Sequence, residues 1–184
     1  MNEQVNKQDL ASKFNFNQFD SNDRSLQRVI VRVSSVLERD ELVQQTINHL
    51  RGSLQVDRVV LYYFYRQWKG RVTFESLRSE QYSILGQTGP DECFNGEYAA
   101  WYEAGRVRAI ADIEAEPIAA CHQEFLRGMQ VRANLVVPVL TAKGLWGLLV
   151  AHNCQATRTW LQPEIELMQE SAEKLATAPS IRET

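Results

Sequence analysis

The chain of 184 residues lacks an excess of positive charge, with 20 Lys and Arg against 23 Asp and Glu and a net charge of -3. We therefore expect no nucleic-acid partner, because no basic stripe is present to displace counterions from phosphates. The sequence also lacks a run of about 18 apolar residues that could cross a membrane and an N-terminal apolar stretch typical of a signal peptide. We expect a soluble, cytoplasmic protein.

Cysteine and histidine are scarce, with three residues of each type. The cysteines form no C-x-x-C pair and the histidines are scattered, so we expect no metal site. An odd number of cysteines leaves at least one thiol in any pairing within the chain. In a reducing cytosol we expect all of them to be thiols. These residues are Cys93, Cys121, Cys154, His49, His122 and His152.

Hydrophobic residues make up 44% of the chain, which is enough for the core of one domain. Residues 1–22 are polar and lack periodicity, so we expect a flexible N-terminal arm, a domain over residues 23–178 and a tail over 179–184. Amphipathic helices are predicted at both ends of the domain and after Asp40. Their apolar stripes are Leu26, Val29, Val33 and Val36; Val43, Ile47, Leu50 and Leu54; and Ile165, Met168, Ala172 and Leu175.

Between these helices the pattern is typical of strands. Residues 56–65 and 71–77 predict one hairpin, residues 133–140 and 145–152 a second, and residues 107–113 a further strand. Residues 79–93 predict a loop, and short helices are expected at 96–104 and 119–129. This order indicates an α+β fold with an antiparallel sheet. The terminal helices either pack on the sheet or contribute part of their stripes to a second subunit.

The candidates for chemistry are the thiols and their neighbours. Cys121 and His122 are adjacent in a predicted helix, where side chains point about 100° apart, so a catalytic dyad is not expected. The helix N-terminus favours the Cys121 thiolate and addition to an electrophile. Cys93 lies in a polar loop two residues after Asp91, whereas Cys154 is typical of a packed thiol. His152 is equally consistent with a core histidine and a ligand contact.

The element order resembles a GAF domain over residues 30–178. Within it, Cys121-His122, the segments Phe125-Leu126 and 131–135, and residues 145–152 resemble the bilin-binding GAF domains of phytochromes and cyanobacteriochromes. Residues 91–94 match the D-x-C-F motif of one cyanobacteriochrome subfamily, which uses two cysteines. The resemblance implies a central antiparallel sheet flanked by helices, and a photoreceptor module rather than an enzyme.

The resemblance also implies a site for one linear tetrapyrrole, phycocyanobilin or its isomer phycoviolobilin. Cys121 would form a thioether to the A-ring side chain, and Cys93 would add reversibly to the bridge between rings B and C, producing a blue/green-type colour switch. Asp91 would accept hydrogen bonds from the pyrrole N–H groups, and His122 would lie beside the central rings. The other implied chromophore contacts are His152, Tyr102, Trp101, Phe94, Phe125, Arg132, Arg108 and Asn134.

Some of these assignments have alternatives. Arg108 and Arg132 are equally consistent with surface arginines. Tyr102 and Trp101 are also consistent with core residues. Phe125 occupies the position where phytochromes usually carry Tyr. There are two competing functions. One is a GAF domain that binds a cyclic nucleotide. The other is a methionine sulfoxide reductase in which Cys93 and Cys121 are redox partners. A homodimer through the terminal helices and an output domain elsewhere in a longer chain are further expectations.

Overall fold

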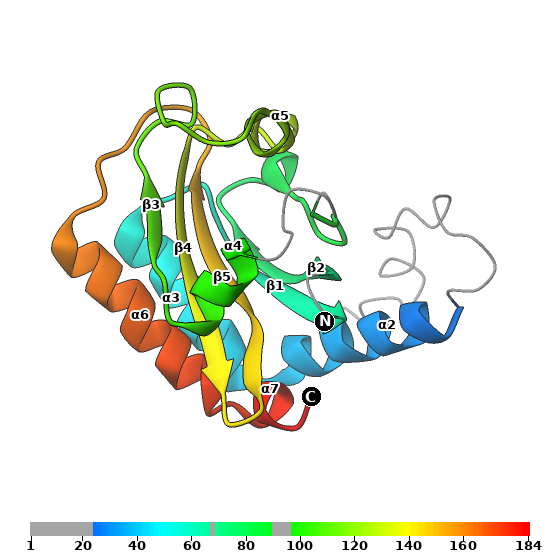
Figure 1. Cartoon of the computed structure of the whole chain (residues 1–184). Helices are drawn as coiled ribbons and strands as arrows, with labels where there is room; N and C mark the ends of the chain where they lie inside the picture. Colours follow the sequence, from blue (N-terminus) through cyan, green and yellow to red (C-terminus); the bar gives the residue numbers. More distant parts are fainter. Residues whose placement is uncertain (1–23, 67–68, 90–96) are drawn as a thin grey trace.

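The computed structural model describes residues 24–66, 69–89 and 97–184, with side chains omitted for 97–99 (Figure 1). Its helices are α2 (Arg24–Arg39), α3 (Glu41–Leu54), the 3-10 turn η3 (Glu80–Tyr82), α4 (Glu97–Glu103), α5 (Ala120–Gly128), α6 (Gln162–Ala176) and α7 (Pro179–Arg182). Its strands are β1 (Arg58–Arg66), β2 (Lys69–Leu77), β3 (Arg108–Ile110), β4 (Ala133–Thr141) and β5 (Gly144–Asn153).

The five strands form one antiparallel sheet in the order β2-β1-β5-β4-β3. Both predicted hairpins are present, as β1–β2 and β4–β5, and the α+β prediction is confirmed. The predicted strand over 107–113 is shorter, because a turn begins at Asp112, whose carbonyl accepts hydrogen bonds from the N–H groups of Ala115 and Glu116. The turn takes the chain out of the sheet after Ile110.

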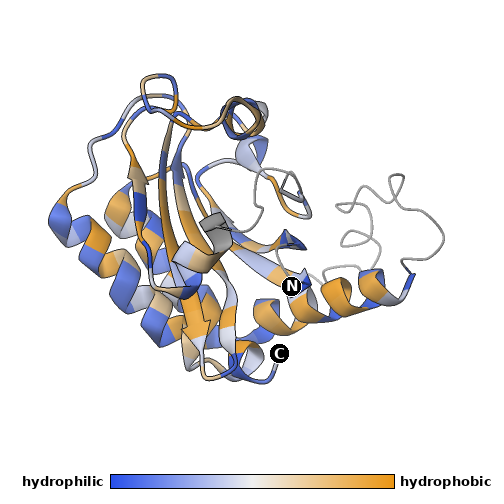
Figure 2. Ribbon diagram, viewed as in Figure 1, coloured by the Kyte–Doolittle hydropathy of each residue, from blue (hydrophilic) through white to orange (hydrophobic). Residues whose placement is uncertain are grey.

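The sheet is covered on both faces, which explains its continuously apolar strands. Figure 1 shows α3 and α6 on one face and α4 on the other. In β1, Val59 and Leu61 face the α3/α6 side, whereas Val60 and Tyr62 belong to the cluster on the opposite side. Figure 2 shows apolar residues along the central strands. The alternation along each strand therefore separates a structural core from a second apolar layer.

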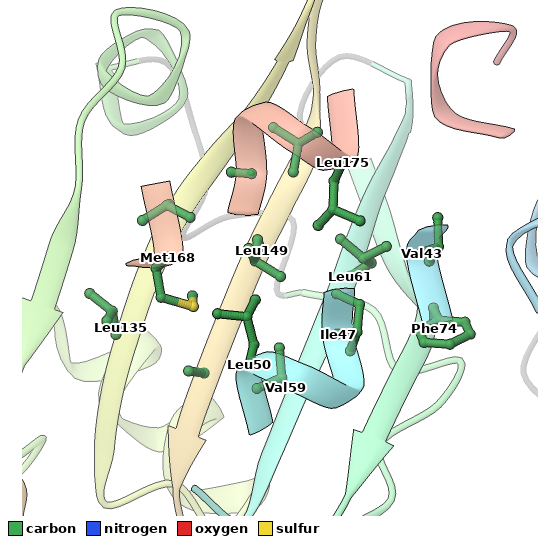
Figure 3. Packing of buried hydrophobic residues seen from close by; sticks show 14 of the residues in the cluster. Val43, Ile47, Leu50, Val59, Leu61, Phe74, Leu135, Leu149, Met168 and Leu175 are labelled. Atoms are coloured by element: carbon green, nitrogen blue, oxygen red, sulfur yellow. The ribbon is translucent and has the colours of Figure 1, made fainter. Parts of the chain in front are cut away.

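The main core lies between the sheet and helices α3 and α6 (Figure 3). The predicted α3 stripe is confirmed, since all four of its residues are buried. In α6, Met168, Ala172 and Leu175 are buried and Ile165 is half-buried. The helix predicted after Asp40 is present, and Asp40 is its N-cap, because the Asp40 carboxylate accepts hydrogen bonds from the N–H groups of Leu42 and Val43. His49 lies on the exposed side of α3.

The α2 stripe differs from the prediction. Ile30, Val33 and Leu37 are buried, whereas Val29 and Val36 are 46% and 42% exposed. Apolar residues occupy more than one side of this helix (Figure 2), so the spacing of apolar residues alone is consistent with more than one choice of buried side. Packing against β2, α3 and α7 buries the side of α2 that carries Ile30 and Leu37.

The described residues bear on one of the predicted boundaries, at the C-terminal end of the domain. Within residues 179–184, which we expected as a tail, the structure forms α7, and Ile181 is buried in the main core. The arm over residues 1–22 lies outside the described residues. In the described ranges, no helix combines the length and apolar character needed to span a membrane.

Candidate functional site

A cavity of about 330 Å³ lies on the face of the sheet opposite α3 and α6. Strand residues Val60, Val136, Leu148 and Val150 form its apolar floor, and side chains from α4 and α5 cover it. The strands place these residues on one face because side chains alternate along a strand. Its size and mainly apolar walls are typical of a binding site for a small organic molecule.

Two buried polar side chains interrupt this apolar floor. His152 on β5 and Asn134 on β4 are both 3% exposed, line the cavity and are directly paired across the two strands. The Oδ1 atom of Asn134 has no hydrogen-bond partner among the described residues. Because an unpartnered buried polar atom is costly, these two side chains mark where a ligand would make directional contacts.

Arg58 at the start of β1 holds one of these polar side chains in place. Its Nε donates to Nδ1 of His152 over 2.8 Å, and its Nη1 and Nη2 donate to the carbonyls of Tyr82 and Met129 over 2.8 and 2.7 Å. The side chain is almost completely buried. Burial, and secondarily the Arg58 cation, hold the pKa of His152 well below its ordinary value of 6.5.

Cationic and aromatic groups lie at other points of the lining. The Arg106 guanidinium stacks over the ring of Trp101 at 4.4 Å from its centroid, a cation–π contact. Arg108 forms an ion pair with Glu116, and both residues line the cavity. Trp101 is 43% exposed, so the Arg106–Trp101 pair stands where the cavity meets solvent. This part of the lining is suited to an acidic group of a ligand.

The covering helices contribute His122 and Tyr102. Burial, followed by the nearby Arg108 cation, lowers the pKa of His122, which favours a neutral ring. The His122 ring is tilted by 42° to that of Phe125, with centroids 6.5 Å apart. Burial raises the pKa of Tyr102 to about 12, so its phenol stays protonated at neutral pH. His122 and Tyr102 therefore present uncharged groups to the cavity.

Cys121 is exposed in the first turn of α5, next to the cavity residues Ala119 and His122. No side chain caps the α5 N-terminus, whose dipole favours a thiolate there. The sulfur is in a disulfide bond in the structure, which corrects the expectation that every cysteine is a thiol. Cys154 is a free thiol, and burial raises its pKa to about 11.

The structure gathers seven of the residues suggested by the sequence around one cavity. His122 and Cys121 diverge as expected for adjacent helical residues, because His122 lines the cavity and Cys121 does not. Arg132 also lies outside the lining and pairs with Asp112 over 2.8 Å. Asp91, Cys93 and Phe94 lie outside the described residues. The gathered residues are Trp101, Tyr102, Arg108, His122, Phe125, Asn134 and His152.

Sequence reasoning did not single out Arg58, Arg106 or Glu116. Arg106 follows a predicted helix that ends at Gly105, so its position after Trp101 is a local signal for a stacked pair. No comparable signal exists for Arg58, whose partners are far apart in the sequence. Within the described ranges, no cluster of three or more acidic, histidine or cysteine side chains is placed to hold a metal ion.

The fold and cavity define an α+β domain with a mainly apolar cavity on one face of its antiparallel sheet. The GAF domain family model matches residues 38–178, and the chain belongs to this family. An uncharacterized protein of Picosynechococcus is 51% identical to it, with 84% of this chain and 94% of that protein covered. The circadian input-output histidine kinase CikA of Synechocystis is 32% identical over 83% of this chain, which spans only 24% of the length of CikA.

Similar solved structures include light-sensing GAF domains. The blue-light absorbing form of the PixJ GAF domain from Thermosynechococcus elongatus has a TM-score of 0.66 and 32% identity, covering 80% of this chain and 87% of that one. The phycocyanobilin-bound GAF domain of a cyanobacterial phytochrome has a TM-score of 0.66 and 29% identity, covering 82% and 91%. These neighbours support a photosensory role for a cavity of this kind.

Proposed function

We propose that this chain is a photosensory module that binds a linear tetrapyrrole in the cavity and attaches it at Cys121. The observation that carries the proposal is the position of Cys121 beside a mainly apolar cavity whose floor holds the buried pair His152 and Asn134. The bilin-bound and light-absorbing structural neighbours support it independently.

The residues present fit such a pigment. A linear tetrapyrrole combines a long conjugated body with N–H and C=O groups and with two carboxylates. The apolar walls suit the body, and the unpartnered Oδ1 of Asn134 can accept a hydrogen bond from an N–H group. Arg106 and Arg108 are the candidate partners of the carboxylates, and the neutral ring of His122 can pack beside the central rings.

Attachment follows from ordinary thiol chemistry at Cys121. The sulfur first has to be released from its disulfide by a dithiol reductant, which becomes oxidised in the exchange. The thiol then adds across the double bond of the A-ring side chain. A C–S bond replaces the π bond, and the thiol proton passes to the neighbouring carbon. The addition step needs no oxidant, and the α5 dipole assists it by stabilising the thiolate.

We further propose that the chain belongs to the two-cysteine cyanobacteriochromes, on the basis of the D-x-C-F match at residues 91–94. A bound pigment supplies visible absorption through four conjugated rings and a double bond beside ring D that light isomerises. Reversible addition of the Cys93 thiol to the bridge between rings B and C would divide that conjugation and shift absorption to violet or blue. Asp91 would hold the pyrrole N–H groups.

The pigment would be phycocyanobilin, converted wholly or in part to phycoviolobilin. Conversion at the A-ring bridge shortens the conjugation and is expected for a blue/green-type cycle. Spectra of the acid-denatured protein decide this point, because denaturation removes the effect of the pocket. A denatured product that matches only phycocyanobilin after long incubation would contradict the conversion.

Attachment is tested by producing the protein in cells that make phycocyanobilin. We expect a coloured, photochromic protein whose pigment stays with the chain after acid denaturation. Cys121→Ala should abolish this covalent pigment, whereas the matched control Cys154→Ala should retain it. Because the Cys121 sulfur is in a disulfide, purified apoprotein should take up added pigment covalently after reduction and not after oxidation.

The competing functions have distinct outcomes. Covalent pigment in Cys121→Ala would overturn the attachment site while leaving a bilin-binding function in place. Colourless wild-type protein that binds a cyclic nucleotide would replace the proposed function. Turnover of methionine sulfoxide by the reduced protein would favour the redox hypothesis, for which the disulfide at Cys121 is the relevant observation.

We also propose that residues 23–178 act as the sensory unit of a longer protein, with an output domain elsewhere. The support is that the chain spans about a quarter of the kinase CikA, which is a longer protein with this region as one part. The terminal helices α2 and α6 would then carry the signal out of the domain.

A further inference from the structure

We propose that Arg58 is a positioning residue that sets the tautomer of His152, so that His152 presents an N–H donor to the cavity. Both residues belong to this chain, and their contact is present without a bound pigment. Its consequence for a bilin rests on the proposed function above.

The Arg58 side chain is a cation buried at 1% exposure whose three assigned hydrogen bonds all go to neutral acceptors. A buried charge is costly unless its donors are satisfied. Here the acceptors are a ring nitrogen of β5 and two carbonyls, from η3 and from the end of α5. Arg58 therefore joins three segments that surround the cavity and is held in one orientation by all of them.

This orientation determines the protonation of His152. A guanidinium has N–H donors and no acceptor, so the nitrogen facing Arg58 Nε at 2.8 Å must offer a lone pair. In a neutral imidazole the proton then resides on the other nitrogen, Nε2. A doubly protonated ring would set two N–H groups against each other. The geometry therefore favours the neutral ring with Nε2–H.

The donor faces the cavity. His152 shares its side of the sheet with its lining partners Asn134 and Val150, and the described residues supply no hydrogen-bond partner for Nε2. The site therefore offers a donor at this point and selects an acceptor atom, such as a carbonyl or carboxylate oxygen. With a bilin bound, that acceptor would be a lactam carbonyl or a propionate oxygen.

Other charges near the ring do not reverse this assignment. Burial is the main cause of the lowered His152 pKa, and the Arg58 cation adds to it. Asp57 is engaged with the backbone N–H of Cys154 over 2.7 Å. The remaining titratable or charged groups that line the same cavity come from β1, α4, β3, α5 and the segments beside them, and are Tyr62, Tyr102, Arg106, Arg108, Glu116 and His122.

Nuclear magnetic resonance on apoprotein with ¹⁵N-labelled histidine and arginine tests the proposal without pigment. Long-range correlations between ring protons and ring nitrogens distinguish the two neutral tautomers and the imidazolium, and His152→Gln assigns the signals. We expect the Nε2–H pattern, unchanged between about pH 5 and pH 8, the range in which an unperturbed histidine titrates. The same protein unfolded in denaturant should titrate across this range.

The role of Arg58 is tested by Arg58→Met, which removes the donors but keeps a side chain of similar length. We expect His152 to lose its single tautomer and give signals of both forms. Arg51→Met, on α3 at the opposite face, should leave the His152 pattern unchanged. If Arg58→Met does not fold, a scalar coupling across the hydrogen bond between Arg58 Nε and His152 Nδ1 in the wild-type protein decides the question.

The proposal is overturned by a wild-type ring protonated at Nδ1, by an imidazolium at pH 6, or by an unchanged tautomer in folded Arg58→Met. Absence of the cross-bond coupling also overturns it where that variant is unfolded. A failure to bind bilin would contradict the proposed function and leave these signals unaffected, so the two failures are distinguishable.

Discussion

The carboxylate of Asp40 accepts a hydrogen bond of 2.7 Å from the hydroxyl of Ser180, 140 positions later in the chain. Its other oxygen caps α3 through the N–H groups of Leu42 and Val43. One side chain therefore joins the start of α3 to α7 at the C-terminal end of the domain. The α7 residue Ile181 is buried beside this link.

Replacement of Asp40 by Ala is expected to lower the free energy of unfolding by about 1–2 kcal/mol, the usual cost of losing a helix N-cap. Urea denaturation measures the change. Ser180→Ala is the matched control, because it removes the hydroxyl that bonds Asp40 and keeps the cap. It should cost less than Asp40→Ala. Equal stabilities of Asp40→Ala and the wild-type protein would contradict the cap assignment.

The contribution of Asp40 also depends on pH. Burial raises its pKa, but hydrogen bonds from Ser180, Val43 and Leu42 outweigh that effect and hold the pKa below its ordinary value of 3.8. A carboxyl group with a lowered folded-state pKa stabilises the fold above its unfolded pKa. The stability difference between wild-type protein and Asp40→Ala should therefore be present at neutral pH. It should shrink as the pH falls below about 4 and through the folded-state pKa.

Replacement of Cys93 by Ala is expected to leave the pigment on Cys121 and remove the violet- or blue-absorbing state. A longer-wavelength pigment should take its place, because the conjugation is no longer interrupted. Absorption spectra before and after illumination measure the change. A thiol-alkylating reagent should act likewise, fastest in the photostate with a free Cys93. Cys154→Ala provides the background that excludes alkylation there. An unchanged short-wavelength state in Cys93→Ala would show that the D-x-C-F match has no such role.

Arg106 is expected to strengthen pigment binding through a carboxylate. In a Cys121→Ser background, which isolates non-covalent binding, Arg106→Gln should weaken affinity roughly two- to fivefold, the effect of about 0.5–1 kcal/mol for a solvent-exposed ion pair. Fluorescence quenching on titration with bilin measures this. Arg132→Gln is the control, since Arg132 pairs with Asp112 outside the cavity lining. Equal losses in both variants would argue against a specific contact at Arg106.

The exposed apolar residues of α2 predict self-association through this helix. Val29 and Val36 are seven residues apart and share one exposed side, whereas Val31, 42% exposed, lies on another. Sedimentation should detect a dimer that Val29→Lys/Val36→Lys dissociates and Val31→Lys leaves intact. A wild-type monomer at high concentration in both photostates would exclude this dimer for the present chain.

Much of the fold follows from local sequence pattern. Asp40 and the stripe from Val43 to Leu54 define α3, because its cap and its buried face both lie within a few turns of one helix. The hairpins follow from β-branched and aromatic runs separated by short turns. Cys121 and His122 are adjacent in the sequence. Side chains of adjacent helical residues point about 100° apart, so it was predictable that only one of the two, His122, would line the cavity.

Tertiary structure alone decided which α2 residues are buried, because the helix is apolar on more than one side and only its neighbours choose the register. It also decided that Arg58 is buried, since a solitary arginine at the start of a strand carries no local sign of burial. Its acceptors come from residues 82, 129 and 152, three segments that meet only after the sheet has formed. Those distant carbonyls and the ring nitrogen offset the cost of removing the cation from water.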